Sequence, residues 1–295
     1  MDNKLIVILG PTASGKTSLA IKLAKQFSAK SEGEIVSADS RQIYKEMNIG
    51  TAKPTKQEQQ KITHHLIDII NPNQDFALNQ YKKLAISKIK DIQQRNKVPF
   101  LVGGTGLYIQ AIVDNLEIPE VKPNHKLRKK LEMLDLIELL KMLRKLDPAV
   151  IKKIDIHNKR RLIRALEVCL TTGKPFSEQK RTGKPLFDVL QIGLKIDKKT
   201  LDQRIDKRVD KMIKDGLITE VRNLLKKYSS TLPSMSGIGY KEITLCLTPE
   251  LNIEQIKSHT RQYAKRQITW FKRDKRIKWV KDYKEAEKLV SQFLS

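Results

Sequence analysis

Residues 10–17 read Gly10-Pro11-Thr12-Ala13-Ser14-Gly15-Lys16-Thr17, which fits the pattern G-x-x-x-x-G-K-[ST]. An apolar run at residues 5–9 precedes them and predicts a short buried strand, and residues 16–26 predict a helix. In such a turn the glycines let backbone N–H groups surround a di- or triphosphate, and the helix N-terminus adds positive potential. We therefore predict a phosphate site of the kind found in nucleotide-binding and ATP-binding proteins. Lys16 would contact phosphate oxygens, and the Thr17 hydroxyl would help to hold Mg²⁺.

Two further apolar runs predict strands in the same sheet. Residues 34–38 end at Asp39, and residues 98–102 end at Gly103, with helical segments between them. Alternating strands and helices predict a parallel sheet covered by helices on both faces. The predicted fold is α/β, a P-loop NTPase-like parallel sheet flanked by helices. Because ligands bind at the carboxyl ends of such strands, the turns after all three strands should meet on one edge.

The sequence changes character after Pro119. Residues 125–146 are charged, rich in leucine and helical in pattern, and a second helix is predicted at 158–172, before Gly173-Lys174-Pro175. Residues 190–196 alternate like a strand, which indicates a return to the sheet. We predict a core made of residues 1–118 and 190–295, a helical insertion domain at 119–189 and a long basic helix at 254–273.

The chain is strongly basic, with 58 Lys and Arg against 33 Asp and Glu and a formal net charge of +25. This favours polyanionic partners, so RNA, DNA, an anionic membrane and a surface merely rich in lysine all stay open. The two cysteines, Cys169 and Cys246, lie far apart, which argues against a disulfide scaffold or zinc site and fits a reducing compartment. No stretch approaches the length of a membrane span. We therefore predict a cytoplasmic protein that does not enter a membrane.

The acidic residues at the predicted edge leave the reaction open. An enzyme that transfers phosphate usually has an Asp at the end of a second strand, where it holds Mg²⁺. Here Val102 leads into Gly103-Gly104-Thr105-Gly106 without an acid, although Asp68 could serve. This weakens a kinase interpretation without excluding it. Asp39 is placed equally well to accept a proton or to cap a helix.

Six motifs follow one another along the chain: GPTASGKT (10–17), DSRQIYKEMNIGTAKP (39–54), HHLIDI (64–69), GGTGLY (103–108), SGIGYKE (236–242) and TRQYAKRQITWF (260–271). Together they resemble the tRNA dimethylallyltransferase family, also called tRNA isopentenyltransferases, over nearly the whole chain. GPTASGKT alone is shared by many nucleotide enzymes, whereas IGTAKP and YAKRQITWF are diagnostic. The chain resembles the shorter bacterial form rather than eukaryotic members that add a C-terminal zinc finger.

The resemblance implies a reaction and roles for several residues. A dimethylallyl group would move from dimethylallyl pyrophosphate to the exocyclic amine of the adenosine on the 3′ side of the anticodon. Asp39 would accept the amine proton, and Thr105 would orient the amine or the bridging oxygen. An arginine within residues 201–209 would contact pyrophosphate together with residues 10–17. Arg204 and Arg208 lie four apart on one helical face and both stay open, with Arg208 preferred.

The implied partner is the anticodon stem-loop of a tRNA, whose target base must be splayed out to react. By resemblance, Asp39, Ser40, Arg41, Gln42 and Thr105 would meet the flipped base. The expected RNA surface comprises Arg128, Arg160, Arg161 and Arg164 in the insertion and Gly237, Tyr240, Lys241, Arg261, Gln262, Lys265, Arg266 and Gln267 toward the C-terminus. Trp270 and Phe271 are expected in the core. We expect a monomer, because a bound tRNA would cover much of one face.

Three other functions make different predictions. A P-loop kinase of a small metabolite would turn over ATP and would not need the basic C-terminal helix. A non-catalytic RNA-binding protein that uses the loop as a nucleotide switch would tolerate loss of Asp39. An isopentenyltransferase of free adenine nucleotides would need neither the insertion nor a charge of +25.

Overall fold

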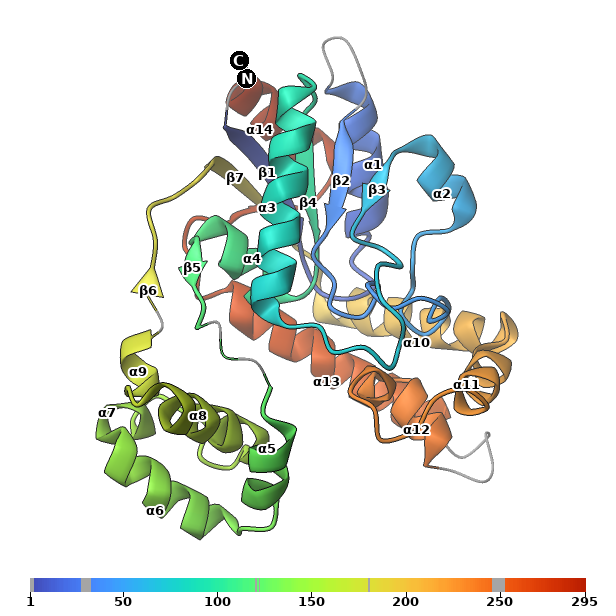
Figure 1. The fold of residues 1–295 in the computed structure, drawn as a ribbon. Helices are drawn as coiled ribbons and strands as arrows, with labels where there is room; N and C mark the ends of the chain where they lie inside the picture. The colour runs from blue at the N-terminus through green and yellow to red at the C-terminus, as the bar shows by residue number, and fades with distance from the viewer. Residues whose placement is uncertain (1–2, 28–32, 120, 122, 180, 246–252) are drawn as a thin grey trace. The chain divides into compact units, whose positions relative to one another are not determined.

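The chain forms two compact units in a computed structural model that describes residues 3–27, 33–119, 121, 123–179, 181–245 and 253–295. The first unit comprises Met1–Val113 and Leu186–Ser295, and the second comprises Asp114–Pro185 (Figure 1). The first unit carries all three of the strand-end turns that the sequence places at one edge. The predicted cysteine pattern is described only in part, since Cys246 lies outside the described residues while Cys169 is buried in the second unit.

A six-stranded parallel sheet forms the centre of the first unit, with the order β3-β2-β4-β1-β7-β8. Its strands are β1 (Lys4–Leu9), β2 (Glu34–Ser37), β3 (His64–His65), β4 (Pro99–Gly103), β7 (Asp188–Leu194) and β8 (Lys278–Val280). The parallel α/β sheet that the sequence predicts is confirmed. Strand β7 begins and ends two residues earlier than predicted, because Asp188 to Gly193 pair in register with Lys4 to Leu9.

Helices cover both faces of this sheet, because β1 is apolar on both sides. Leu5, Val7 and Leu9 pack with α3 (Leu78–Gln94) and α4 (Gly106–Val113), whereas Ile6 and Ile8 pack with α1 (Lys16–Gln26) and α14 (Tyr283–Leu294). A strand buried on both faces has no polar alternation, which is why this run reads as continuously hydrophobic. The turn after β1 therefore follows a strand that is covered by helices on both faces.

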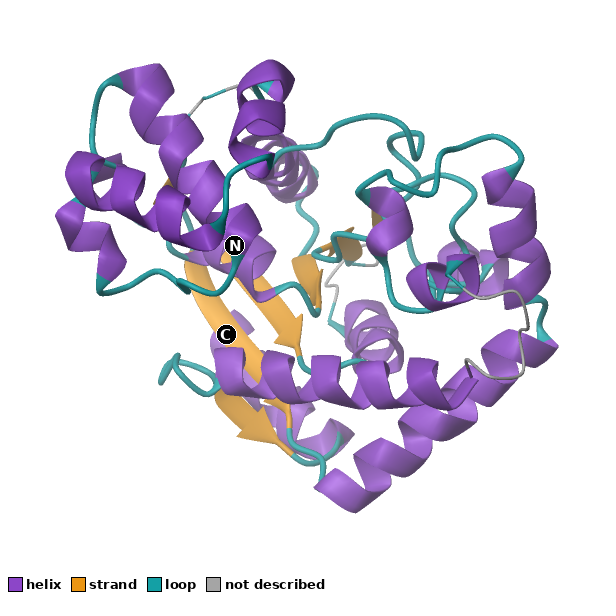
Figure 2. Cartoon of the chain, turned by 90° about the horizontal axis from the view of Figure 1, so that it is seen from below, coloured by secondary structure: helices purple, strands orange, loops and turns teal. Residues whose placement is uncertain are grey.

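A group of helices lies at the carboxyl ends of the strands (Figures 1 and 2). It consists of α10 (Lys198–Lys214), α11 (Leu217–Leu225), the 3₁₀ turn η1 (Ser234–Ser236), α12 (Tyr240–Thr244) and α13 (Ile253–Phe271), while α2 (Lys56–Lys61) lies beside β3 (Figure 1). Helix α10 packs against α13 through a small apolar cluster, and this cluster includes Ala13 of the phosphate loop. Residues far apart in the sequence thus surround the predicted site.

The second unit is mostly helical. It contains β5 (Leu116–Glu117), α5 (His125–Glu132), α6 (Leu136–Leu146), α7 (Pro148–Ile151), α8 (Lys159–Thr172), α9 (Phe176–Gln179) and β6 (Arg181–Thr182). The predicted single helix at 125–146 is wrong, because Asp135 and Glu138 form a capping box that starts α6 as a separate helix. Helix α8 agrees closely with the prediction, from its Asn158 cap to the left-handed Gly173.

The limits of the second unit differ from the predicted 119–189. Strand β5 pairs antiparallel with β6, which ties residues 116–117 to residues 181–182. Since that pairing lies within one unit, the boundary falls at Asp114 on one side and Pro185 on the other. In the described part of the chain, no helix is both long and apolar enough to cross a membrane.

Candidate active site

The phosphate loop, residues 10–17, joins β1 to α1 as predicted. Gly15 has φ = 93° at the start of α1, and Ala13 also lies in the left-handed region, with φ = 61°. Lys16 turns back over the loop, and its Nζ donates to the Pro11 carbonyl at 3.2 Å. Burial lowers the pKa of Lys16 to about 8, with the nearby Asp39 carboxylate opposing that shift and Arg208 adding to it. The loop is thus a concave turn of backbone N–H groups with the Lys16 ammonium group beside it, an arrangement that favours phosphate binding.

Two arginines of α10 reach this loop in different ways. Arg208 donates from Nη1 to the Thr12 hydroxyl at 3.2 Å and lines the cavity, where burial lowers the pKa of its guanidinium. Arg204 approaches the Ser14 carbonyl at 3.5 Å and is exposed. The sequence left both arginines open, and the geometry places only Arg208 among the cavity residues.

Asp39 lies in a tight turn directly after β2. Its Oδ1 accepts the Arg41 amide at 2.9 Å, so the carboxylate fixes its own turn rather than capping a helix. The side chain lines the same cavity as Lys16 and Arg208. Since one hydrogen bond occupies one oxygen, acceptor capacity is left on the carboxylate for a proton from a substrate.

The glycine turn, residues 103–106, lies beside the Asp39 turn. Thr105 donates its amide to the Ala38 carbonyl at 3.2 Å, and its hydroxyl accepts from the Ser40 amide at 3.0 Å. A side chain at Gly103 would overlap the Ala38 backbone, so the close approach of the two turns requires glycine. The Thr105 hydroxyl therefore ties the two turns together. Nearby, burial raises the pKa of Tyr263 to about 12, so this phenol stays neutral beside Thr105.

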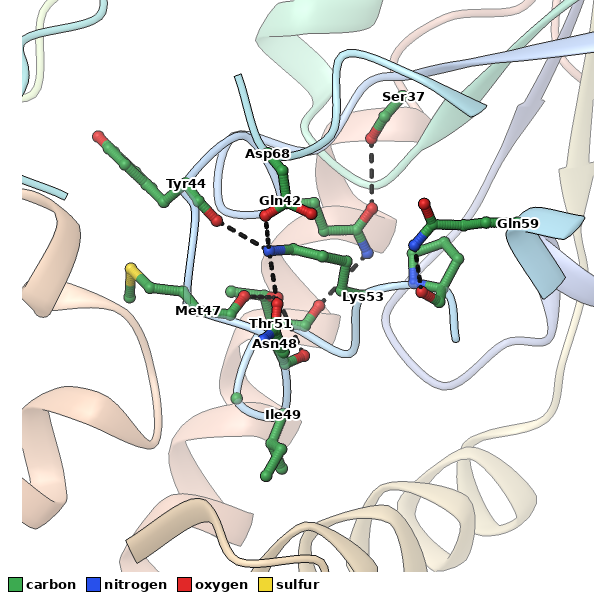
Figure 3. Close-up of polar contacts among 12 residues, drawn as sticks. Ser37, Gln42, Tyr44, Met47, Asn48, Ile49, Thr51, Lys53, Gln59 and Asp68 are labelled. Atoms are coloured by element: carbon green, nitrogen blue, oxygen red, sulfur yellow. Dashed lines mark hydrogen bonds and ion pairs between the residues drawn. The ribbon is translucent and has the colours of Figure 1, made fainter. Parts of the chain in front are cut away.

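Arg41 and Gln42 use their side chains within the protein. The Arg41 guanidinium donates to the carbonyls of Pro233 and Ser234 at 2.8 and 3.1 Å. Gln42 donates to the carbonyls of Thr51 and Ala52 at 3.3 and 3.1 Å and accepts from the Ser37 hydroxyl at 3.3 Å (Figure 3). Both ends of the Gln42 amide are thus engaged within the protein, while the residue also lines the cavity described below.

The IGTAKP segment, residues 49–54, is held in place by two charged residues. Lys53 donates to the Tyr44 carbonyl, the Asn48 side chain and Asp68, the last at 2.5 Å (Figure 3). Asp68 is therefore an ion-pair partner of Lys53 and does not line the cavity. Glu220 of α11, which the sequence did not single out, accepts the amides of residues 48–50 and the Tyr240 hydroxyl. Nothing in the sequence around Glu220 signals this role.

These parts enclose one cavity of about 500 Å³ in the first unit. Such a volume suits a small ligand with a charged and an apolar part. The polar part of its lining includes Lys16, Thr17, Asp39 and Arg208. An apolar part comes from Val209, Met212, Leu217, Ile238 and Ile256. We did not predict this apolar lining from the sequence, although Val209 and Met212 lie at i and i+3 on α10, next to Arg208.

The site fits Mg²⁺ held jointly with phosphate. Mg²⁺ commonly keeps several waters and takes one or two protein oxygens plus substrate phosphates. The Thr17 hydroxyl lines the same cavity as the rest of the phosphate loop, so a protein oxygen of this kind is present. Among the described residues no cluster of three His, Cys, Asp or Glu could hold a metal by itself.

The arginines expected on RNA fall into two groups in the second unit. Arg128 and Arg164 both bind the buried Glu167, at 2.7 and 2.5 Å. Arg160 and Arg161 are exposed at the start of α8. Glu167 also accepts the Asn124 amide at 2.7 Å, so it joins α5 to α8. Arg128 and Arg164 therefore belong first to the scaffold of this unit.

The residues expected on RNA near the C-terminus also divide. Lys241, Gln262, Lys265 and Arg266 are exposed, and Arg261 pairs with Asp206. Tyr240 is buried against Gly50, and Gln267 is buried beside the phosphate loop. Phe271 is 3% exposed and Trp270 packs against the same core, which confirms both as core residues.

The comparisons with known proteins agree with this geometry. The family model described as "IPP transferase" matches residues 42–274. The chain belongs to the IPP transferase family. A curated relative from Caldanaerobacter subterraneus subsp. tengcongensis, named tRNA dimethylallyltransferase, is 47% identical over 98% of this chain and 96% of its own.

Two solved structures of this family extend the likeness to the fold. The tRNA isopentenylpyrophosphate transferase of Bacillus halodurans is 36% identical, with a TM-score of 0.74 over 99% of this chain and 97% of its own. A eukaryotic dimethylallyltransferase, described as acting on tRNA, is 31% identical, with a TM-score of 0.79 over 99% of this chain and 77% of its own. The P-loop NTPase-like fold class predicted from the sequence is confirmed.

Ligand binding by this family member should depend on the charge of Lys16. Its pKa of about 8 in the free protein rises when an anion binds, so Lys16 strengthens binding fully below pH 8 and loses this contribution as pH rises through the pKa of the complex. We expect calorimetric titration with inorganic pyrophosphate at fixed Mg²⁺ to measure this effect. The affinity of the unaltered protein, divided by that of Lys16→Arg, should fall above pH 8. A constant ratio from pH 6.5 to 9.5 would count against a role for Lys16.

Proposed function

We propose that the chain transfers a dimethylallyl group from dimethylallyl pyrophosphate to the exocyclic amine of the adenosine next to the anticodon on its 3′ side, in a tRNA. The products are isopentenyladenosine and pyrophosphate. The proposal rests on one cavity that combines the phosphate loop, the Asp39 carboxylate and an apolar wall from α10 and α11. A phosphate cradle joined to an apolar wall suits an allylic pyrophosphate better than a nucleotide.

The acceptor amine needs help because its lone pair is delocalised into the adenine ring. As the new N–C bond forms, the allylic C–O bond breaks, the pyrophosphate leaves with the electron pair and the amine loses a proton. Asp39 accepts that proton. Lys16, Arg208 and the loop amides stabilise the charge that develops on the leaving group. Bound Mg²⁺, held by Thr17 and phosphate oxygens, would neutralise part of the same charge.

Thr105 orients the reacting groups in this proposal. Its hydroxyl already bonds to Ser40, which fixes it beside Asp39, and the flanking glycines permit close approach of a substrate. The cavity places Asp39 and the phosphate loop together, so a base that enters beside Asp39 would meet the allylic carbon. Arg41 and Gln42 line the same cavity as Asp39, so they would meet the base that enters beside it.

The tRNA would be bound by the exposed basic residues. These are Arg160 and Arg161 of α8 and Lys241, Lys265 and Arg266 of the first unit. Together with a net charge of +25, they favour a long polyanion over a small acceptor. We further propose that the enzyme works as a monomer in the cytoplasm, because a bound tRNA would cover much of one face.

A direct assay tests the reaction. The protein is incubated with Mg²⁺, labelled dimethylallyl pyrophosphate and unmodified tRNA, and the digested RNA is searched for the alkylated nucleoside. In one parallel reaction, labelled ATP and a small acceptor replace dimethylallyl pyrophosphate and tRNA. In another, AMP replaces tRNA. We expect the alkylated nucleoside only when tRNA is the acceptor, and no turnover of ATP. ATP turnover with a small acceptor would support a kinase instead, and alkylated AMP at equal efficiency would support a transferase of free nucleotides.

Affinity for tRNA should fall steeply between 50 and 200 mM salt, because each neutralised phosphate releases counterions. We expect Arg160→Ala with Arg161→Ala to lower the slope of log Kd against log salt by about one to two, roughly one per lost contact. A matched pair on the surface of α14, Lys284→Ala with Lys288→Ala, should leave the slope unchanged. Filter binding measures the Kd of all three proteins for tRNA. A Kd of the unaltered protein that does not change with salt would contradict binding through phosphate contacts.

A further inference from the structure

Gln267 connects two turns that the proposed reaction uses for different substrates. It lies on α13 with only 6% of its surface exposed. Its Oε1 accepts the Thr12 amide at 2.8 Å, and its Nε2 donates to the Gly104 carbonyl at 2.8 Å. One side chain thus joins the phosphate loop to the glycine turn across 163 and 255 positions of sequence.

The chemistry of these two bonds explains the residue type. A backbone N–H on one side and a carbonyl on the other require one acceptor and one donor on the same side chain. A primary amide supplies both, whereas an ionised carboxylate only accepts and an ammonium group only donates. The packing is equally restrictive, because a Cβ atom on Gly104 would overlap the Gln267 amide.

The two residues that Gln267 contacts lead directly to reacting groups. Thr12 receives the Arg208 guanidinium on its hydroxyl, in the half of the site that would hold pyrophosphate. Gly104 precedes Thr105, whose hydroxyl fixes the Ser40 amide beside Asp39, in the half that would hold adenine. Shifting Gln267 would therefore change the spacing between the leaving group and the proton acceptor.

We propose that Gln267 is a positioning residue that sets the spacing between the pyrophosphate half and the adenine half of the site. This rests on the proposed function, and it replaces the expectation that Gln267 contacts tRNA. Lys265 and Arg266, its exposed neighbours on α13, carry the RNA surface, while Gln267 faces inward. Because in-line attack tolerates little misplacement, a shift of about 1 Å costs on the order of 100-fold in rate.

A double-mutant cycle between Gln267→Ala and Gly104→Ala tests this role. Gln267→Ala breaks both hydrogen bonds, and Gly104→Ala displaces the amide by overlap. We expect each variant to lower kcat by about 30- to 100-fold. The KM values for both substrates should stay within about threefold of those of the unaltered protein. The double variant should be no slower than Gln267→Ala, because the added methyl group then has nothing to displace.

The remaining variants keep the test decisive. Gln267→Met preserves the packing volume but removes the hydrogen bonds, so its kcat should match that of Gln267→Ala. It can replace Gln267→Ala in the test if that variant does not fold. Gln292→Met on the exposed surface of α14 should behave as the unaltered protein. Additive losses in the cycle, or a loss confined to KM for tRNA, would overturn the positioning role. Absence of product from the unaltered protein would instead overturn the proposed function.

Discussion

Asp39→Asn is expected to lower kcat by about 10²- to 10⁴-fold while KM for both substrates changes little. The amide keeps an oxygen for the Arg41 N–H, so the turn should survive, but it cannot accept the amine proton. Single-turnover transfer of labelled dimethylallyl groups measures the loss. The fold is checked by thermal melting of the same preparation.

Asp215→Asn is the matched control for that experiment. Asp215 is the exposed C-terminal cap of α10 and pairs with Lys211, so its carboxylate is close to α10 but outside the cavity. We expect normal turnover from this variant. Equal rates for Asp39→Asn and the unaltered protein would remove Asp39 as the proton acceptor while leaving the transfer reaction in place.

Arg208→Ala should lower kcat by about 10²- to 10³-fold, the usual loss when one preorganised donor to a developing negative charge is removed. The neighbouring Arg204→Ala is the matched comparison, since it removes the same side chain one helical turn away. Arg204 is exposed and outside the cavity lining, so its loss should cost less than about threefold.

The pair also separates two explanations of the same loss. If α10 arginines acted only by raising the local positive potential, both variants would weaken binding to a similar degree, and salt would reduce both effects. Contact with the leaving group predicts a loss in kcat for Arg208→Ala that persists at high salt. Rates for a series of dimethylallyl pyrophosphate and tRNA concentrations, measured at low and at high salt, decide between them.

Much of the fold could be predicted because its signals are local. The run at residues 5–9, the glycine-rich loop and the Gly173 stop depend on neighbours within one turn or strand. The single long helix predicted at 125–146 was wrong for a local reason as well, since Asp135 and Glu138 form a capping box inside a leucine-rich pattern. Strand β8 and helix α14, beyond the predicted basic helix, complete the sheet and its cover without an obvious motif.

The candidate site was predicted only where residues carry a motif. Lys16, Asp39 and Arg208 line one cavity, and Thr105 lies in the turn beside Asp39, while their roles stay predictions. The partners of Gln42, Gln267 and Arg164 could not be predicted, because a polar side chain in a motif looks the same whether it meets a ligand or a backbone group. Of these three residues Gln267 is the buried one, and its burial depends on packing between residues far apart in sequence.

The most direct test of the proposed transfer reaction compares the two products of a single turnover. Enzyme in excess is mixed with labelled dimethylallyl pyrophosphate and an anticodon stem-loop, and released pyrophosphate is counted against alkylated adenosine at the position 3′ of the anticodon. We expect equal amounts, with alkylation abolished when that adenosine is replaced by guanosine. Pyrophosphate released without alkylated RNA, or alkylation elsewhere in the loop at the same rate, would contradict the proposed reaction.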